Sequence, residues 1–286
     1  TNVIKKPLCN VITPVSMDHM NFLGKSIQKI AYEKAGIIKD KSIVVMSKQK
    51  KIVREIVRKE IKKKQSILFE EGNSWKIVNI KKKTFLLNYK NCLYEYPLPK
   101  LAGKHQIENA ATAISVIKSI KKNFIEEKII TKGIENVFWP ARMQKINSGK
   151  LQKKCCGNFD IWLDGGHNDH AASMIFNFIK NWTDLNKILI LGMTAGKNPT
   201  GFLRKIIDQF NFLILLPIDN HQYIQPYEIK ENVKKKLKKK INIECCLNIN
   251  DALSLISDNY SSGKILICGS LYLAGQVLKA DGFKIK

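Results

Sequence analysis

Residues 16–39 read Ser-Met-Asp-His-Met-Asn-Phe-Leu-Gly-Lys-Ser-Ile-Gln-Lys-Ile-Ala-Tyr-Glu-Lys-Ala-Gly-Ile-Ile-Lys and join the end of a strand to a helix. The apolar stretch 11–15 just before them predicts the strand. Ile27, Ile30 and Ala31 then recur at i, i+3 and i+4, which is the spacing of one helix face. A strand that leads through a loop into an amphipathic helix is typical of parallel α/β folds.

The apolar face of this helix also contains a lysine. Lys34 stands at i+7 from the first apolar position, between a favourable N-cap at Ser26 and a predicted stop at Gly36. Lysine is rarely buried unless a partner or a change of charge compensates it. Because Asp18 and His19 precede the helix at the end of a strand, an inward Lys34 predicts a functional site there. The alternative is a lysine whose stem lies along the protein and whose ammonium group reaches water.

The order of predicted elements divides the chain near Pro140. The first part has a strand at 43–46, a helix at 50–64, β-rich pieces within 66–96 and a long helix at 104–121. The second part alternates strands and helices, with strands predicted at 161–163, 188–191, 212–216, 241–245 and 265–268. Such alternation is typical of a parallel, doubly wound sheet. We therefore predict an α/β fold with two domains, residues 1–139 and residues 140–286.

The chain is strongly basic, with a formal net charge of +25 at pH 7. Only 4 of its 49 basic residues are arginine, the residue that best forms bidentate contacts to phosphates and bases. Its lysine runs lack interleaved aromatic residues, so we expect nonspecific, salt-sensitive affinity for polyanions and no specific nucleic-acid recognition. The apolar runs are too short to span a bilayer, so no membrane partner is predicted. The 7 cysteines have no metal-ligand spacing, which favours reduced thiols in the cytoplasm.

A second candidate site follows the predicted strand that ends at residue 163. Residues 163–172 read Leu-Asp-Gly-Gly-His-Asn-Asp-His-Ala-Ala, which indicates a strand end, a glycine turn and a helix start. The free N–H groups and the dipole of such a helix favour a phosphate or carboxylate, with Asp164 at the strand end and His167 in the turn. The alternative is an ordinary turn capped by Asn168, which fits the pattern equally well.

Three further polar residues stand where ligands commonly bind. Asn109 lies four residues after His105 on the polar side of the long helix, where its flat amide could receive a nucleobase. Arg142 stands at the predicted domain junction, and Ser270 begins a helix after the last strand. The ordinary explanations are a solvated helix face, a surface arginine and a helix cap.

In combination these motifs resemble one family, the folylpolyglutamate synthase and dihydrofolate synthase branch of the Mur-type ATP-dependent ligases. The matching blocks follow the family's order along nearly the whole chain and are residues 1–4, 18–24, 33–39, 103–111, 140–142, 164–168 and 269–273. The resemblance implies part of a Mur-type P-loop ATPase central domain in residues 1–139. It implies a Rossmann-like, glutamate-binding C-terminal domain in residues 140–286.

The resemblance also implies a reaction and its cofactors. A ligase of this family uses ATP to ligate L-glutamate to folate or dihydropteroate through an acyl phosphate, with Mg²⁺ as the metal. His19 matches a magnesium ligand of the family. Lys34 matches a catalytic lysine that is carbamylated and supports a second magnesium ion.

Five more residues match family positions at the nucleotide and the substrates. Asn109 matches an adenine contact, and Arg142 and Asp164 match contacts to the phosphates and ribose of the nucleotide. His167 matches a catalytic position near the transferred phosphate or the glutamate. Ser270 matches a glutamate contact.

Two of the departures from the family pattern bear most directly on activity. The complete Gly-x-x-x-x-Gly-Lys-Ser/Thr phosphate loop occurs nowhere, because the triplet at 24–26 lacks the first glycine. Without that loop the β- and γ-phosphates are not cradled. After the strand at 188–191, Gly196-Lys197-Asn198 replaces the family's Asp-Lys-Asp. Two alternatives therefore stand beside the ligase: a catalytically inactive truncated remnant, and a subunit that needs a separately encoded P-loop fragment.

Overall fold

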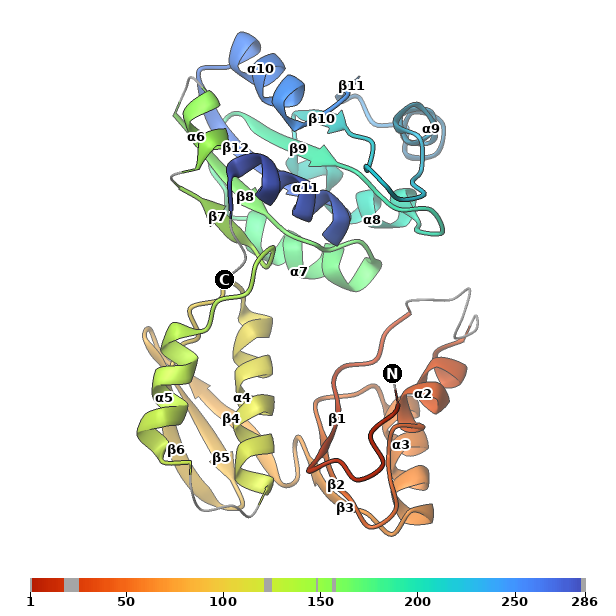
Figure 1. Cartoon of the computed structure of the whole chain (residues 1–286), viewed down its shortest axis with the longest axis vertical. Coiled ribbons are helices and arrows are strands. Elements are labelled where there is room, and N and C mark those ends of the chain that lie inside the picture. Colours follow the sequence, from red (N-terminus) through yellow and green to blue (C-terminus); the bar gives the residue numbers. More distant parts are fainter. Residues whose placement is uncertain (1, 18–25, 121–124, 148, 156–157, 284–286) are drawn as a thin grey trace. The chain divides into compact units, whose positions relative to one another are not determined.

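The computed structural model describes residues 2–17, 26–120, 125–147, 149–155 and 158–283. The chain divides into two compact units, Thr1–Phe138 and Trp139–Lys286. Each unit contains strands and helices around its own buried apolar residues (Figure 1). The α/β class predicted from the sequence is confirmed.

The first unit begins with a small parallel sheet. Its strands are β1 (Asn10–Ile12), β2 (Ile43–Met46) and β3 (Ile67–Glu70), in the order β1-β2-β3. Helices α2 (Ile27–Ala35) and α3 (Lys51–Lys63) pack against each other beside it. β1 is shorter than the apolar stretch 11–15, because Pro14 has no N–H to donate to a strand ladder.

An antiparallel sheet and two helices complete the first unit. The strands are β4 (Trp75–Ile80), β5 (Thr84–Tyr89) and β6 (Cys92–Pro97), in the order β4-β5-β6. Helices α4 (Lys104–Ser119) and α5 (Glu127–Asn136) follow. Since α4 contacts β2 as well as β4 and β5, it joins the two sheets of this unit.

The second unit is built on one sheet of six strands. They are β7 (Gln144–Ile146), β8 (Asn158–Leu163), β9 (Lys187–Leu191), β10 (Phe212–Leu215), β11 (Asn242–Cys245) and β12 (Ser262–Cys268). The strand order is β11-β10-β9-β12-β8-β7, and every pairing is parallel except that of β7 with β8. The predicted parallel, doubly wound sheet is therefore confirmed, with β7 added as an antiparallel edge.

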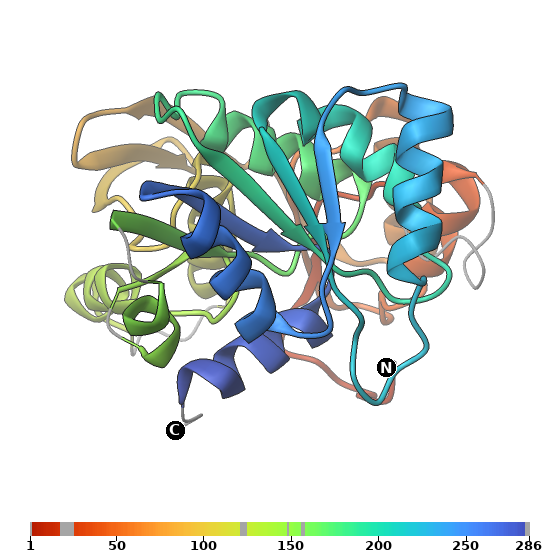
Figure 2. The same cartoon turned by 90° about the horizontal axis from the view of Figure 1, so that it is seen from above.

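Helices cover both faces of this sheet. They are α6 (Lys150–Lys154), α7 (Asp169–Ile179), α8 (Pro199–Ile206), α9 (Pro226–Asn232), α10 (Ile249–Asn259) and α11 (Leu271–Asp281), with short helices η1 (Ile207–Gln209) and η2 (Val233–Leu237). Figure 2 shows α7 and α8 on one side of the strands and α10 and α11 on the other.

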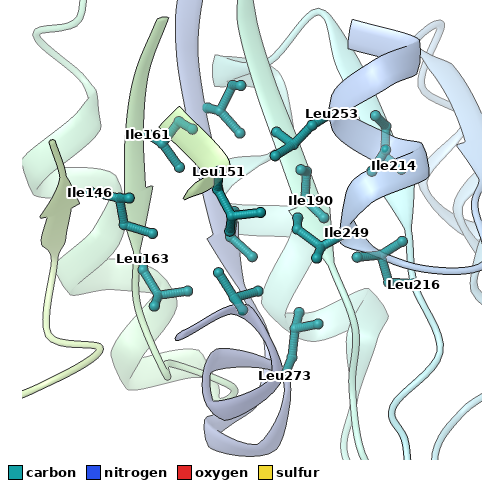
Figure 3. Close-up of a cluster of buried hydrophobic side chains, with 14 of the residues drawn as sticks. Ile146, Leu151, Ile161, Leu163, Ile190, Ile214, Leu216, Ile249, Leu253 and Leu273 are labelled. Atoms are coloured by element: carbon teal, nitrogen blue, oxygen red, sulfur yellow. The ribbon is translucent and has the colours of Figure 1, made fainter. Parts of the chain in front are cut away.

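The core of the second unit lies between the sheet and the layer of α6, α10 and α11. Figure 3 shows Leu151, Leu253 and Leu273 of these helices pointing at isoleucines of the central strands. Ile161 and Ile190 are completely buried, as expected for parallel strands covered on both faces. This packing fixes the strand ends where the candidate site residues stand.

The described part of the chain contains no helix long and apolar enough to cross a membrane. The thiols of Cys9, Cys92, Cys245, Cys246 and Cys268 are free.

Candidate active site

The carboxyl ends of the first parallel sheet are tied together by buried polar side chains. The Gln49 amide accepts from the Val15 N–H at 3.0 Å and donates to the Thr13 carbonyl at 2.8 Å, which fixes the segment after β1. Ser47, directly after β2, forms a buried 2.9 Å hydrogen bond with Thr112 of α4. The middle of α4 therefore lies beside the carboxyl ends of the strands, where α/β folds commonly bind ligands.

Asn109 lies on α4 one turn before Thr112 and is exposed. Its side-chain nitrogen donates to Gln106 at 3.0 Å, and the Gln106 nitrogen lies 3.1 Å from Nε2 of His105. Gln106 is buried, whereas His105 is only partly exposed. The sequence singled out His105 and Asn109 but missed Gln106, although its i, i+3 spacing to Asn109 is the signal that could have revealed it.

The other two predicted residues of the first unit have different outcomes. His19, with Asp18, lies outside the described residues. Lys34 is exposed in α2, so the expectation that it faces inward is wrong. The buried side chains of this helix are Ile30, Ala31 and Ala35, while the long lysine stem allows the ammonium group to reach water.

Asp164 follows β8 at the carboxyl end of the second sheet and is buried. Its carboxylate accepts from the Met143 N–H at 2.9 Å and from the Gly166 N–H at 2.7 Å. Burial raises the pKa of Asp164, while these hydrogen bonds and the positive charges of Arg142 and His167 act in the opposite direction. The carboxylate therefore joins two backbone segments that the sequence separates by more than twenty residues.

Arg142 stands on a strained turn that Asp164 holds. Ala141 and Met143, on either side of it, have left-handed φ values of 54° and 43°, and both are buried. The Gly165 N–H donates to the Ala141 carbonyl at 2.9 Å. A Cβ on Gly165 would lie 3.3 Å from Nη1 of Arg142 and would overlap Leu271, so only glycine leaves room for both side chains. The guanidinium group is thus held near the start of α11.

His167 lies in the turn before α7. Its Nδ1 is 3.1 Å from the Gly165 carbonyl, which orients the ring. Asn168 caps α7 by accepting from the Ala171 N–H at 2.9 Å, as the ordinary alternative predicted. The turn that carries Arg142 and the ring of His167 both contact the short segment 164–166, which contains Asp164, so the structure brings these three predicted residues together.

Ser270 is buried, and its hydroxyl caps α11 by accepting from the Tyr272 N–H at 3.1 Å. The cap is the ordinary explanation of this serine, and its predicted contact with glutamate stays a prediction. Beside it, the exposed Tyr272 lies against His221 with ring centroids 3.5 Å apart and ring planes tilted by 36°, a pair that the sequence did not indicate. Asn198, where the family has an acidic residue, caps α8 by accepting from the Gly201 N–H at 3.0 Å.

Within the described residues no group of three His, Cys, Asp or Glu side chains could hold a metal ion. Arg142 and the starts of α7 and α11 instead favour anionic groups such as phosphate or carboxylate. This edge of the sheet is therefore suited to holding a negatively charged group.

Two known domain families match the chain. The Mur ligase middle domain matches residues 2–117, and the C-terminal domain of dihydrofolate synthetase matches residues 144–280. The two α/β units and their polar strand ends therefore define a Mur-type ligase as the class of protein.

Relatives and solved structures narrow this class. The chain is 25% identical over 293 residues to a probable dihydrofolate synthetase of Schizosaccharomyces pombe. It is 27% identical over 305 residues to the dihydrofolate synthetase of Saccharomyces cerevisiae. Each alignment covers 98% of this chain and 67% of the relative. A Mycobacterium tuberculosis folylpolyglutamate synthase complexed with ADP and AMPPCP has a TM-score of 0.83 at 22% identity, covering 100% of this chain and 66% of that one. The chain belongs to the folylpolyglutamate synthase and dihydrofolate synthase family, and it spans about two thirds of the length of these relatives.

Proposed function

We propose that this chain takes part in the ATP-dependent ligation of L-glutamate to folate or dihydropteroate through an acyl phosphate. The observation that carries the proposal is the Arg142 turn, which is strained, buried at both flanks and anchored by Asp164. Strained backbone that the surrounding structure enforces is typical of functional sites. A guanidinium group on an anchored turn at the end of a parallel sheet is suited to phosphate oxygens.

Each unit has its own part in this proposal. Residues 1–139 contribute the nucleotide-binding part, with Asn109 at the adenine. Residues 140–286 form the glutamate-binding domain. There Arg142 neutralises phosphate charge, and Asp164 holds its turn and reaches the ribose through its remaining lone pairs. His167 lies near the transferred phosphate or the incoming amine. Ser270, at the start of α11, contacts the glutamate.

Two solved relatives support the choice of substrates. The Mycobacterium tuberculosis folylpolyglutamate synthase was crystallised with ADP and AMPPCP, and an Escherichia coli relative with DHPP and ADP. Curated relatives carry both activity names, dihydrofolate synthetase and folylpolyglutamate synthase. An adenine nucleotide is common to both complexes, and the activity names support a folate-type acceptor.

His19 and Lys34 are the two residues that we propose for magnesium binding. The described residues do not assemble a metal site by themselves, and Lys34 is exposed. We therefore route no step of the reaction through the metal. Bound Mg²⁺ would neutralise phosphate oxygens, which is the chemistry that His19 and a carbamylated Lys34 would support.

The proposal is tested by a ligation assay with ATP, L-glutamate and dihydropteroate. We expect the chain alone to bind Mg-ATP weakly, because it lacks the complete phosphate loop, and to gain activity when a fragment that carries this loop is added. The Arg142→Ala variant should abolish that activity, whereas the Arg204→Ala variant, at an exposed position of α8, should keep it. Sub-micromolar Mg-ATP binding by the chain alone would contradict the role given to the loop.

The same assay separates the two alternatives. Activity that appears only with the added fragment indicates a complementing subunit. Absence of ligation under every condition, in a chain that still binds adenine nucleotides, indicates an inactive remnant. Ligation by the chain alone would refute both alternatives.

A further inference from the structure

Three polar side chains at the start of α4 form a continuous hydrogen-bonded row. The Asn109 nitrogen donates to the Gln106 oxygen at 3.0 Å, and the Gln106 nitrogen lies 3.1 Å from Nε2 of His105. Gln106 is 6% exposed, so its amide cannot exchange these partners for water. Gly103, with a left-handed φ of 109°, leaves room for the imidazole, since a Cβ there would lie 2.7 Å from Cε1 of His105.

The hydrogen bond at the oxygen of the Gln106 amide determines the role of its nitrogen. Its oxygen accepts from Asn109, so its nitrogen must donate to His105, and Nε2 of His105 must accept. A neutral His105 then carries its proton on Nδ1. Reversing the Gln106 amide alone would set two donors against each other at Asn109, so the row reverses only if Asn109 turns as well and the His105 proton moves to Nε2.

This row determines which edge Asn109 shows to solvent. Its nitrogen is turned toward Gln106, so the oxygen and one remaining N–H face outward on an exposed residue. Among the described residues the Asn109 oxygen has no hydrogen-bond partner. An outward amide oxygen beside an N–H is the pattern that pairs with the amino group and ring nitrogen of adenine.

We propose that Gln106 is the positioning residue that sets the base specificity of the nucleotide site by fixing the amide of Asn109. The inference rests on the proposed nucleotide-binding function. A base with a carbonyl in place of the adenine amino group would set its oxygen against the Asn109 oxygen, and neither acceptor would gain a donor. The site therefore prefers adenine because Gln106 holds the Asn109 amide with its oxygen facing outward.

The test uses adenosine 5′-monophosphate (AMP) and inosine 5′-monophosphate (IMP), in which a carbonyl replaces the amino group and the neighbouring N1 carries a proton. Both are titrated into the full ¹⁵N-labelled chain, and the amide signals of α4 report binding. We expect AMP to bind at least about tenfold more tightly than IMP, the discrimination of one well-placed amide contact. Monophosphates are used because they do not depend on a loop for the β- and γ-phosphates.

Two variants at position 106 separate orientation from simple packing. Gln106→Met keeps the length of the side chain but removes both polar ends, so the AMP/IMP ratio should fall to within about threefold of unity. Gln106→Glu keeps an acceptor for Asn109, so the ratio should persist, while the ¹⁵N shifts of His105 should change as its proton moves to Nε2. Gln209→Met, the same substitution in the second unit, is the control and should leave the ratio unchanged.

Each outcome decides a different statement. If the wild-type chain binds neither ligand, the proposed nucleotide site fails and the role of Gln106 fails with it. If the chain binds both ligands equally, or if Gln106→Met keeps the wild-type ratio, nucleotide binding stands and this inference is overturned. Unchanged His105 shifts in Gln106→Glu would also overturn it, because the row would then not exist in solution.

Discussion

At the scale of single residues, the protonation of Asp164, which anchors the Arg142 turn, affects the folding stability of the chain. The Asp164 carboxylate accepts the Met143 and Gly166 N–H groups, and burial raises its pKa above that of an exposed aspartate. The folded state therefore holds a proton on this group more tightly than the unfolded state does. Folding stability from this group is highest at low pH and is lost as the pH rises through the folded pKa.

The Asp164→Asn variant removes that ionisation. We expect the unfolding free energy of the variant, minus that of the wild type, to increase as the pH rises from about 4, the ordinary aspartate value, through the raised pKa. The measurement is a urea titration of the full chain at several pH values, followed by hydrogen exchange in β8. A difference that stays flat, or that decreases with pH, would show that the carboxyl has no raised pKa in the folded state.

Some site residues were predictable because their local sequence fixes their place. Asp164 and His167 follow directly from a strand–glycine turn–helix pattern, and Ser270 from a helix start. The inward direction predicted for Lys34 was wrong, because helical periodicity describes the Cβ direction and not the path of a long flexible stem. Gln106 was missed since its importance depends on burial, which an isolated polar residue does not reveal.

At the scale of elements, helix α6 depends on a side chain from the far end of the second unit. The Asp281 carboxylate of α11 accepts from the Leu151 N–H at 2.9 Å and so satisfies the start of α6. Gly149 precedes this helix, and a Cβ there would overlap the Asp281 carboxylate. The short helix, five residues long, is stabilised by this tertiary contact rather than by its own propensity.

We expect Gly149→Ala to destabilise the second unit by about 1–2 kcal/mol, because Asp281 must move and its hydrogen bond is lost. The matched control is Gly275→Ala within α11, where an added Cβ meets nothing within 4 Å. That change should stabilise by about 0.5–1 kcal/mol, since alanine is the better helix former. Thermal unfolding of both variants of the full chain shows whether each substitution stabilises or destabilises the protein. The same change in stability for both variants would contradict the role of Asp281.

Helix α3 is fastened to the end of β3 by an asymmetric ion cluster. Glu70 is 4% exposed in its side chain and meets Arg54 at 3.2 Å and Arg58 on its other oxygen, whereas these arginines are 37% and 47% exposed. The arginines can turn to water if Glu70 is removed. The carboxylate cannot, so loss of the arginines leaves a buried charge whose remaining side-chain donor is the neutral Asn73 amide, at 3.3 Å.

Because of this asymmetry, we expect removal of the two arginines to destabilise the protein more than neutralisation of Glu70. Glu70→Gln should destabilise by about 1–3 kcal/mol, the range of hydrogen bonds to charged groups. The double variant Arg54→Ala with Arg58→Ala should cost more, about 3–5 kcal/mol. Arg204→Ala, at an exposed position, should stay within about 0.5 kcal/mol of the wild type. Denaturant unfolding of the full chain ranks them, and the reverse order would contradict the asymmetry.

Element types were predictable where the apolar pattern was long or sharply bounded. β2 begins and ends at the predicted residues, β4 and β5 lie within the predicted β-rich stretch, and the parallel sheet of the second unit followed from regular alternation. β7 and α6 were missed, because one has three residues and the other five. Pairing with β8 and the Asp281 contact stabilise them, and neither partner is close in sequence.

At the scale of the whole molecule, the net charge of +25 is spread unevenly. All six lysines of residues 234–240 are exposed, around η2 and the start of β11. Lys235 pairs with Glu231 at 3.4 Å and Lys239 with Asp208 at 2.6 Å. Within the described chain, the lysines at 234, 236, 238 and 240 have no ion pair. This segment precedes β11, so it lies at the opposite end of the sheet from Arg142 and Asp164.

This separation predicts polyanion binding that is independent of the candidate active site. Duplex DNA should bind at about 50 mM salt with no preference for sequence, and the affinity should fall by orders of magnitude by about 200 mM. Glutamine at the four unpaired lysines should make the logarithmic salt slope shallower by up to about 3–4, because each phosphate contact contributes about 0.9. Arg142→Ala should leave the slope within about one unit of the wild type. A salt-insensitive or sequence-selective complex would instead indicate a true nucleic-acid site, which the lysine-only composition of this segment argues against.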